Sequence, residues 1–187
     1  VHVEVEEQID TYEPANNGAG PLWCHGCTVI TRHQDGVFAV GLETLPNEVP
    51  LNNTRWVLYH RHDDGDWKAI HRNVGRTREP SPIALLGTAL LVSANPTLAA
   101  TGEYGGNAEA VVFRFDVTDL EQEPTSRQPD WVGHPPFRDH SYRTFIGDAA
   151  TGQALYMQNE GYDVAHLSFL DGGQWHGRGV IRWPFGD

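Results

Sequence analysis

Short runs of alternating apolar and polar residues, separated by turn residues, occur along the whole chain. Residues 1–9 alternate strictly and predict one strand with a polar face. Later runs such as 37–42 and 55–61 are bounded by Gly, Asp, Asn and Pro, which is typical of strands joined by turns. No stretch of about eleven residues keeps a helical period. The pattern therefore predicts an all-β fold.

One arrangement of runs occurs three times after residue 22, with a long loop between the second and third runs. The copies start near His25, Glu79 and Ser141, which are 54 and 62 residues apart. Their runs are 27–32, 37–42, 55–61 and 67–71; then 82–86, 89–94 and 108–116 with a weak fourth run inside 117–131; then 142–147, 154–158, 165–170 and 177–183. The repetition indicates three similar structural units.

Four-stranded antiparallel units that repeat every 40–50 residues or so, with loop insertions, are typical of a β-propeller. We expect a single domain over 1–187. It is a partial propeller of about three four-stranded antiparallel blades, at 23–73, 78–131 and 140–183, plus one leading strand. A β-sandwich also has short strands, but it does not predict three copies with the same order of loops. A closed ring needs about four to eight blades, so the rest of the chain or a partner is expected to supply the missing ones.

Charge and composition exclude some classes of partner. The net charge of −12 argues against nucleic acid, which attracts basic surfaces. A local basic pocket can still hold an anion in an acidic protein. No run approaches the roughly 20 apolar residues of a membrane span, so no membrane partner is expected. No signal peptide is visible and the first residue is Val, so we expect processing or truncation.

The two cysteines, Cys24 and Cys27, form the sequence Trp-Cys-His-Gly-Cys. A redox C-x-x-C is usually followed by a helix, whereas 28–31 is predicted to be a strand. A zinc site needs a second pair of ligands, and none occurs at a matching spacing. We expect no cofactor and no metal-ligand set, and a structural metal ion stays an open alternative.

Polar side chains of a few types gather on one predicted face. In a propeller, the loop that enters the first strand of a blade and the loop between its second and third strands share one face. The entry loops carry His25; Arg76, Arg78 and Glu79; and Arg138, His140, Tyr142 and Arg143. The long loops carry Asn52, Asn53 and Arg55; Asn95, Glu103 and Tyr104; and Asn159, Tyr162 and His166. We expect a functional site there, although loops are generally polar and these residues also fit an ordinary surface.

His, Tyr and Arg without a metal set suggest β-elimination from a uronate sugar. Arg neutralises the carboxylate and acidifies the adjacent C–H, His or Tyr removes that proton, and Tyr or His protonates the leaving oxygen. The candidate catalytic residues are His140, Tyr142, Arg143, His25, His166 and Arg78. The candidate substrate-binding residues are Asn52, Asn53, Arg55, Asn95 and Tyr162. On a regular strand His140 and Tyr142 share a face and Arg143 points the other way, and His25 and His166 are alternative bases.

Several short motifs resemble bacterial propellers of the BNR-repeat, sialidase-like kind. These are Trp-Cys-His-Gly, Gly-Leu-Glu-Thr, Leu-Asn-Asn-Thr-Arg-Trp, Gly-Arg-Thr-Arg-Glu-Pro and Asp-His-Ser-Tyr-Arg. Within that group the chain looks most like the ulvan lyases and related polysaccharide lyases, and 63–67 and 168–175 resemble degenerate Asp-boxes. The resemblance covers most of 23–183. It implies a secreted or periplasmic protein that acts on an acidic polysaccharide or oligosaccharide through a His/Tyr/Arg site.

Two other functions stay open. Arg78-Glu79-Pro80 resembles the Arg-x-Pro with which sialidases hold a carboxylate, so a glycoside hydrolase is one alternative. It would need a Tyr nucleophile with a Glu partner, such as Tyr142 with Glu79 or Glu43, and an Asp acid. The other alternative is a non-catalytic carbohydrate-binding or interaction propeller, which explains the Asn, Tyr and Arg residues of the loops equally well.

Overall fold

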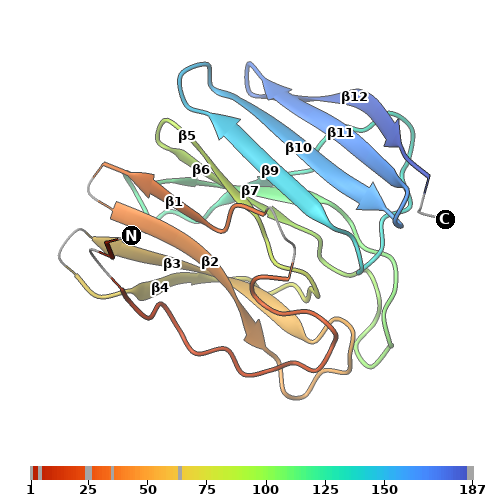
Figure 1. Ribbon diagram of the computed structural model, residues 1–187, viewed down its shortest axis with the longest axis horizontal. Helices are drawn as coiled ribbons and strands as arrows, with labels where there is room; N and C mark the ends of the chain where they lie inside the picture. Colours follow the sequence, from red (N-terminus) through yellow and green to blue (C-terminus); the bar gives the residue numbers. More distant parts are fainter. Residues whose placement is uncertain (1, 4–5, 24–26, 35, 63–64, 185–187) are drawn as a thin grey trace.

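The computed structural model describes residues 2–3, 6–23, 27–34, 36–62 and 65–184. Within these ranges all regular secondary structure is β-strand, and twelve strands form three antiparallel sheets of four (Figure 1). The all-β fold and its three four-stranded units are thus confirmed. Over the same ranges no helix qualifies as a membrane span.

Each sheet follows chain order, so neighbouring strands are joined by hairpin-like loops. The first sheet contains β1 (Ile30–His33), β2 (Gly36–Thr44), β3 (Thr54–His62) and β4 (Lys68–Arg72). The second contains β5 (Ile83–Leu86), β6 (Ala89–Ala94), β7 (Val111–Asp116) and β8 (Thr125–Arg127). The third contains β9 (Arg143–Asp148), β10 (Gln153–Glu160), β11 (Val164–Asp171) and β12 (Gln174–Arg182). The weak fourth run of the second copy is the shortest strand, β8.

The segment before the first sheet corrects one prediction. The described residues of 1–9 form no strand, so the leading strand expected there is wrong for those residues. A strand needs backbone hydrogen bonds from a neighbour, whereas this segment is held through side chains. Glu7 pairs with Arg61 at 2.7 Å, and the Tyr59 hydroxyl donates to the Asp10 carboxylate. Glu7 and Asp10 therefore fix this part of the chain on the first sheet through an ion pair and a hydrogen bond.

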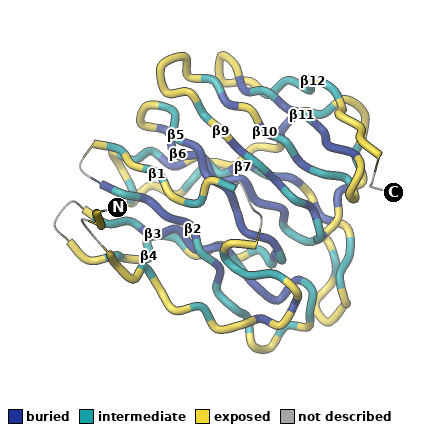
Figure 2. The backbone as a smooth tube through the Cα atoms, viewed as in Figure 1, coloured by how far each residue is buried: buried dark blue, intermediate teal, exposed yellow. Residues whose placement is uncertain are grey.

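The three sheets stack through two apolar clusters. In the first cluster Phe38, Val40, Leu42, Trp56 and Leu58 of the first sheet pack against Ile83, Leu90, Val92, Ala94 and Phe115 of the second. In the other cluster Ala84, Leu91 and Val112 of the second sheet meet Phe145, Tyr156 and Leu170 of the third. The second sheet is therefore covered on both faces, as its dark central strands indicate (Figure 2). This explains why Ile83 and Ala84, which point to opposite faces, are both buried.

The first strands of the sheets lie next to one another, because β5 contacts both β1 and β9. The amide of Ile83 donates to the carbonyl of Thr28 at 2.7 Å, which joins the entrances of the first two sheets. In each antiparallel sheet, the segment before the first strand lies at the same end as the loop between the second and third strands. We call this the entry end of the sheet, and most of the described candidate residues lie at or next to it.

Candidate functional site

Hydrogen bonds connect the loops at the entry ends of neighbouring sheets. Thr54 and Thr77 form a backbone bridge between the first and second sheets, and Asn107 bridges to Arg138 before the third. The buried Asn95 amide adds a side-chain link, because its Nδ2 donates to the Arg138 carbonyl at 2.7 Å. These bonds bring the entry ends of all three sheets together on one side of the molecule.

A buried glutamate pairs with a partly exposed histidine where the second and third sheets meet. Glu79 is 0% exposed, and its Oε1 is 2.8 Å from Nδ1 of His140. The nearest Arg78 nitrogen, Nη1, is 3.8 Å from the same Oε1. A buried carboxylate needs such partners, since an unpaired buried charge is costly. Because a carboxylate only accepts hydrogen bonds, a neutral His140 carries its proton on Nδ1 and its lone pair on Nε2.

Two tyrosines flank the His140 ring. The ring centroids of His140 and Tyr142 are 4.9 Å apart, and those of His140 and Tyr162 are 5.4 Å apart. Tyr142 precedes β9, whereas Tyr162 comes from the loop between β10 and β11 and is 49% exposed. Three side chains that can exchange protons therefore meet at one partly open place.

Arg143 lies behind this group and contacts the backbone. It is 3% exposed and donates to the carbonyls of Pro80 at 2.6 Å and Ser141 at 3.3 Å. It therefore ties the Glu79–Pro80 segment to the start of β9. Burial raises the pKa of the nearby Tyr156 to about 12. The positive charge of Arg143 acts in the opposite direction, but its effect on this pKa is smaller.

Three other candidates, Asn53, Arg55 and His166, have partners in the packing of the loops and sheets. Asn52 is fully buried, and neither of its amide atoms has a hydrogen-bond partner among the described residues. Asn53 Nδ2 donates to the Ala15 carbonyl at 2.8 Å. Arg55 donates to Glu43 at 2.8 Å, and this hydrogen bond lowers the pKa of the Glu43 carboxyl. His166 is buried beside Trp131 and Phe137, and its Nε2 is 2.7 Å from Glu160. The contacts of Asn53 and Arg55 stabilise the first sheet and its loops, and those of His166 lie between the second and third sheets. These residues therefore lie apart from the Glu79–His140 pair.

The structure therefore brings four of the candidates together: Arg78, His140, Tyr142 and Tyr162. His25 lies outside the described residues, as does Cys24. The sequence places Glu79 in an entry loop and offers it as a partner of a Tyr142 nucleophile, but it does not predict the pairing of Glu79 with His140. The position of Glu79 beside Arg78 and directly before a buried strand is the available signal.

A hollow of about 460 Å³ opens beside this group, and Tyr142 forms part of its wall together with Trp23 and Trp183. Cys27 is not part of a metal-ligand set in the described structure; its thiol contacts the Arg143 carbonyl. No group of three or more His, Cys, Asp or Glu side chains suited to a metal ion occurs among the residues described. The histidine, tyrosine and arginine side chains that meet at this place can transfer protons and bind polar groups.

Comparison with known proteins does not assign the chain to a family. No family model matches it, and no curated protein sequence matches it either. The resemblance to BNR-repeat propellers thus rests on short motifs alone. The function has to be argued from the geometry of the Glu79–His140 pair and its neighbours.

Proposed function

We propose that the protein is a polysaccharide lyase that cleaves a uronate-containing polysaccharide by β-elimination. The observation that carries the proposal is the 2.8 Å contact between Glu79 Oε1 and His140 Nδ1. It turns the other ring nitrogen into a proton acceptor, which is what a general base requires. Tyr142 and Tyr162 flank the same ring, and Arg78 lies beside Glu79.

The reaction removes one proton and breaks one bond. The Arg78 guanidinium neutralises the uronate carboxylate, which acidifies the neighbouring C–H. Nε2 of His140 takes that proton, and the electron pair forms a carbon–carbon double bond while the glycosidic C–O bond breaks. The hydroxyl of Tyr142 or Tyr162 protonates the leaving oxygen. Acidic polysaccharides of this kind occur outside cells, so the proposal includes a secreted or periplasmic location.

We also propose that the three sheets are blades of a partial β-propeller. Two observations support this: β5 lies between β1 and β9, and the sheets stack face to face. The outward face of the third sheet is apolar but exposed, with Ile146 65%, Ile181 46% and Leu155 40% accessible. An exposed apolar sheet face of this kind suits packing by a further blade, from the rest of the chain or from a partner.

The lyase proposal is tested with a panel of uronate polymers and the chain itself. We expect the ultraviolet absorbance of unsaturated uronate to rise with at least one polymer, and His140→Ala to abolish the rise. His62→Ala changes an exposed histidine of the first sheet and should leave the rate unchanged. No rise with any uronate polymer would contradict the proposal. Release of free sugar from sialosides instead would favour the hydrolase, although its acid is hard to assign because Asp139 is only 3% exposed.

A second candidate is a propeller that binds carbohydrate without turning it over. The aromatic wall of Trp23, Tyr142 and Trp183 favours it, because aromatic faces pack well against the C–H face of a sugar ring. Saccharide binding that survives both His140→Ala and Tyr142→Phe, with no turnover in either assay, would support this candidate over the lyase.

A further inference from the structure

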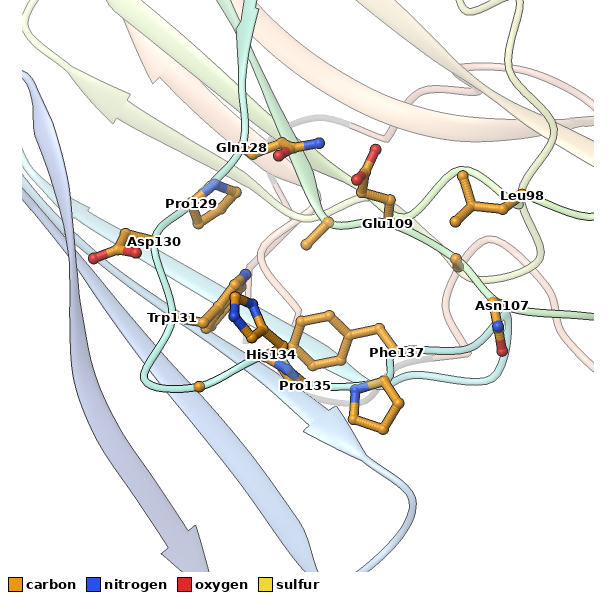
Figure 3. A pocket seen from close by; sticks show the side chains of 14 residues that line it. Leu98, Asn107, Glu109, Gln128, Pro129, Asp130, Trp131, His134, Pro135 and Phe137 are labelled. Atoms are coloured by element: carbon orange, nitrogen blue, oxygen red, sulfur yellow. The ribbon is translucent and has the colours of Figure 1, made fainter.

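A second hollow, of about 440 Å³, lies away from Glu79 and His140, between segment 128–137 and the residues that lead into β7 (Figure 3). Its wall combines aromatic and polar side chains, chiefly Trp131, His134, Phe137, Glu109, Gln128 and Asn107. None of the residues of the Glu79–His140 group lines it. It therefore needs an explanation of its own.

Segment 128–137 is held rigidly against the sheets. Asp130 Oδ2 accepts a hydrogen bond from the amide of Gly177 at 3.2 Å, and Phe137 accepts one from Ala108 at 3.0 Å. A Cβ on Gly177 would lie 2.6 Å from the carbonyl carbon of Trp131, so the segment lies directly on β12. Three prolines within 128–137 restrict its backbone further. The hollow is thus preformed, which lowers the entropy cost of binding a ligand.

The aromatic part of the wall is fixed in orientation. The Trp131 ring lies 5.1 Å from the ring of Phe137 and 5.4 Å from that of Tyr156, measured between centroids. Trp131 is only partly buried and lines the hollow, so part of the indole remains accessible from it. A fixed, partly exposed indole offers an apolar surface to a flat ligand.

The polar part of the wall limits the charge of that ligand. Asn107, Glu109, Gln128, Asp130 and His134 are exposed at the hollow. The amides both donate and accept hydrogen bonds, while the Glu109 carboxylate only accepts them and repels anions. The Asp130 carboxylate points away from the hollow and accepts the hydrogen bond from Gly177 (Figure 3). The best-matched ligand has many hydroxyl groups, no negative charge and one apolar C–H face.

We propose that this hollow binds a neutral saccharide unit, separately from the Glu79–His140 site. Hydroxyl groups of the sugar donate to Glu109 and exchange hydrogen bonds with Gln128 and His134, while its C–H face packs on Trp131. The Glu109 carboxylate disfavours a uronate. The inference does not depend on the lyase activity, since it uses no residue of that site.

The test is a titration of the protein with tetrasaccharides of glucose, xylose and mannose, followed by tryptophan fluorescence and calorimetry. Tetragalacturonate is the anionic comparison. We expect saturable binding of at least one neutral tetrasaccharide below about 10 mM, and any binding of tetragalacturonate, which belongs to the other site, to be unchanged by His134→Ala. Gln128→Ala and His134→Ala should each weaken neutral binding about fivefold, which corresponds to the loss of one hydrogen bond.

Matched variants separate this hollow from the other site. Gln122→Ala and His62→Ala remove the same exposed side chains elsewhere, and Glu79→Gln alters the other site; all three should keep the affinity for the neutral sugar. No saturable binding of any neutral tetrasaccharide would overturn the proposal. Tetragalacturonate binding that is as tight as that of the neutral sugar and is weakened by His134→Ala would overturn it too, as would neutral-sugar affinity that falls with Glu79→Gln but not with His134→Ala.

Discussion

Glu79→Gln is expected to lower kcat/KM on a cleavable uronate polymer by roughly 10²- to 10³-fold. Glutamine keeps the size of the side chain but loses the charge that stabilises His140 once the ring has taken a proton. Glu79 is fully buried, so no solvent ion can replace that charge. Initial rates of unsaturated-uronate formation measure the effect, and the melting temperature checks that the variant is folded.

Two comparisons show whether the loss of kcat/KM in Glu79→Gln arises from the pairing of Glu79 with His140. Glu103→Gln makes the same change in an exposed loop at the entry end and should leave kcat/KM unchanged. The double variant Glu79→Gln/His140→Gln should be little slower than His140→Gln alone, because residues that act as a unit are not additive. Additive losses, or wild-type activity in Glu79→Gln, would mean that Glu79 does not act through His140.

Trp56→Ala is expected to lower the free energy of unfolding by about 3–5 kcal/mol. Trp56 is 0% exposed and lies between the first and second sheets. Its ring is 5.0 Å from that of His71 and 5.1 Å from that of Phe113, so alanine leaves a cavity bordered by rings of both sheets. Urea-induced unfolding of wild type and variant measures the difference.

Two further tryptophan variants calibrate this effect. Trp183→Ala removes a ring that is 36% exposed and should cost less than Trp56→Ala. Trp56→Phe should also cost less, because Nε1 of Trp56 has no hydrogen-bond partner among the described residues and its removal breaks no bond. Equal losses in Trp56→Ala and Trp183→Ala would contradict the packing of the first two sheets described above.

Much of the fold follows from local sequence patterns. Turn residues such as Gly87 and Gly152 mark hairpins, and both have positive φ angles that favour glycine. The alternation in residues 1–9 predicted a strand that the described residues of this segment do not form, because alternation shows only that a segment could pair, not that a neighbouring strand exists. The ion pair of Glu7 with Arg61 depends on tertiary contacts that no local pattern contains.

The sequence predicts which candidate residues share the entry ends of the sheets, because this follows from the order of the strands. Antiparallel order places Arg78, His140 and Tyr162 at entry ends, and the structure brings them together. The order of the strands does not predict that Arg143 turns inward to backbone carbonyls or that His166 is buried against Trp131. Both depend on which face of the third sheet packs on the second, and that is a property of the assembled sheets.

The most direct test of the account is nitrogen NMR of the His140 imidazole in isotopically labelled protein. The central claim is that Glu79 holds His140 as a base through Nδ1. The account predicts that neutral His140 carries its proton on Nδ1, with an unprotonated Nε2, and that His62→Ala leaves this pattern unchanged. A neutral ring with its proton on Nε2 would contradict the claim.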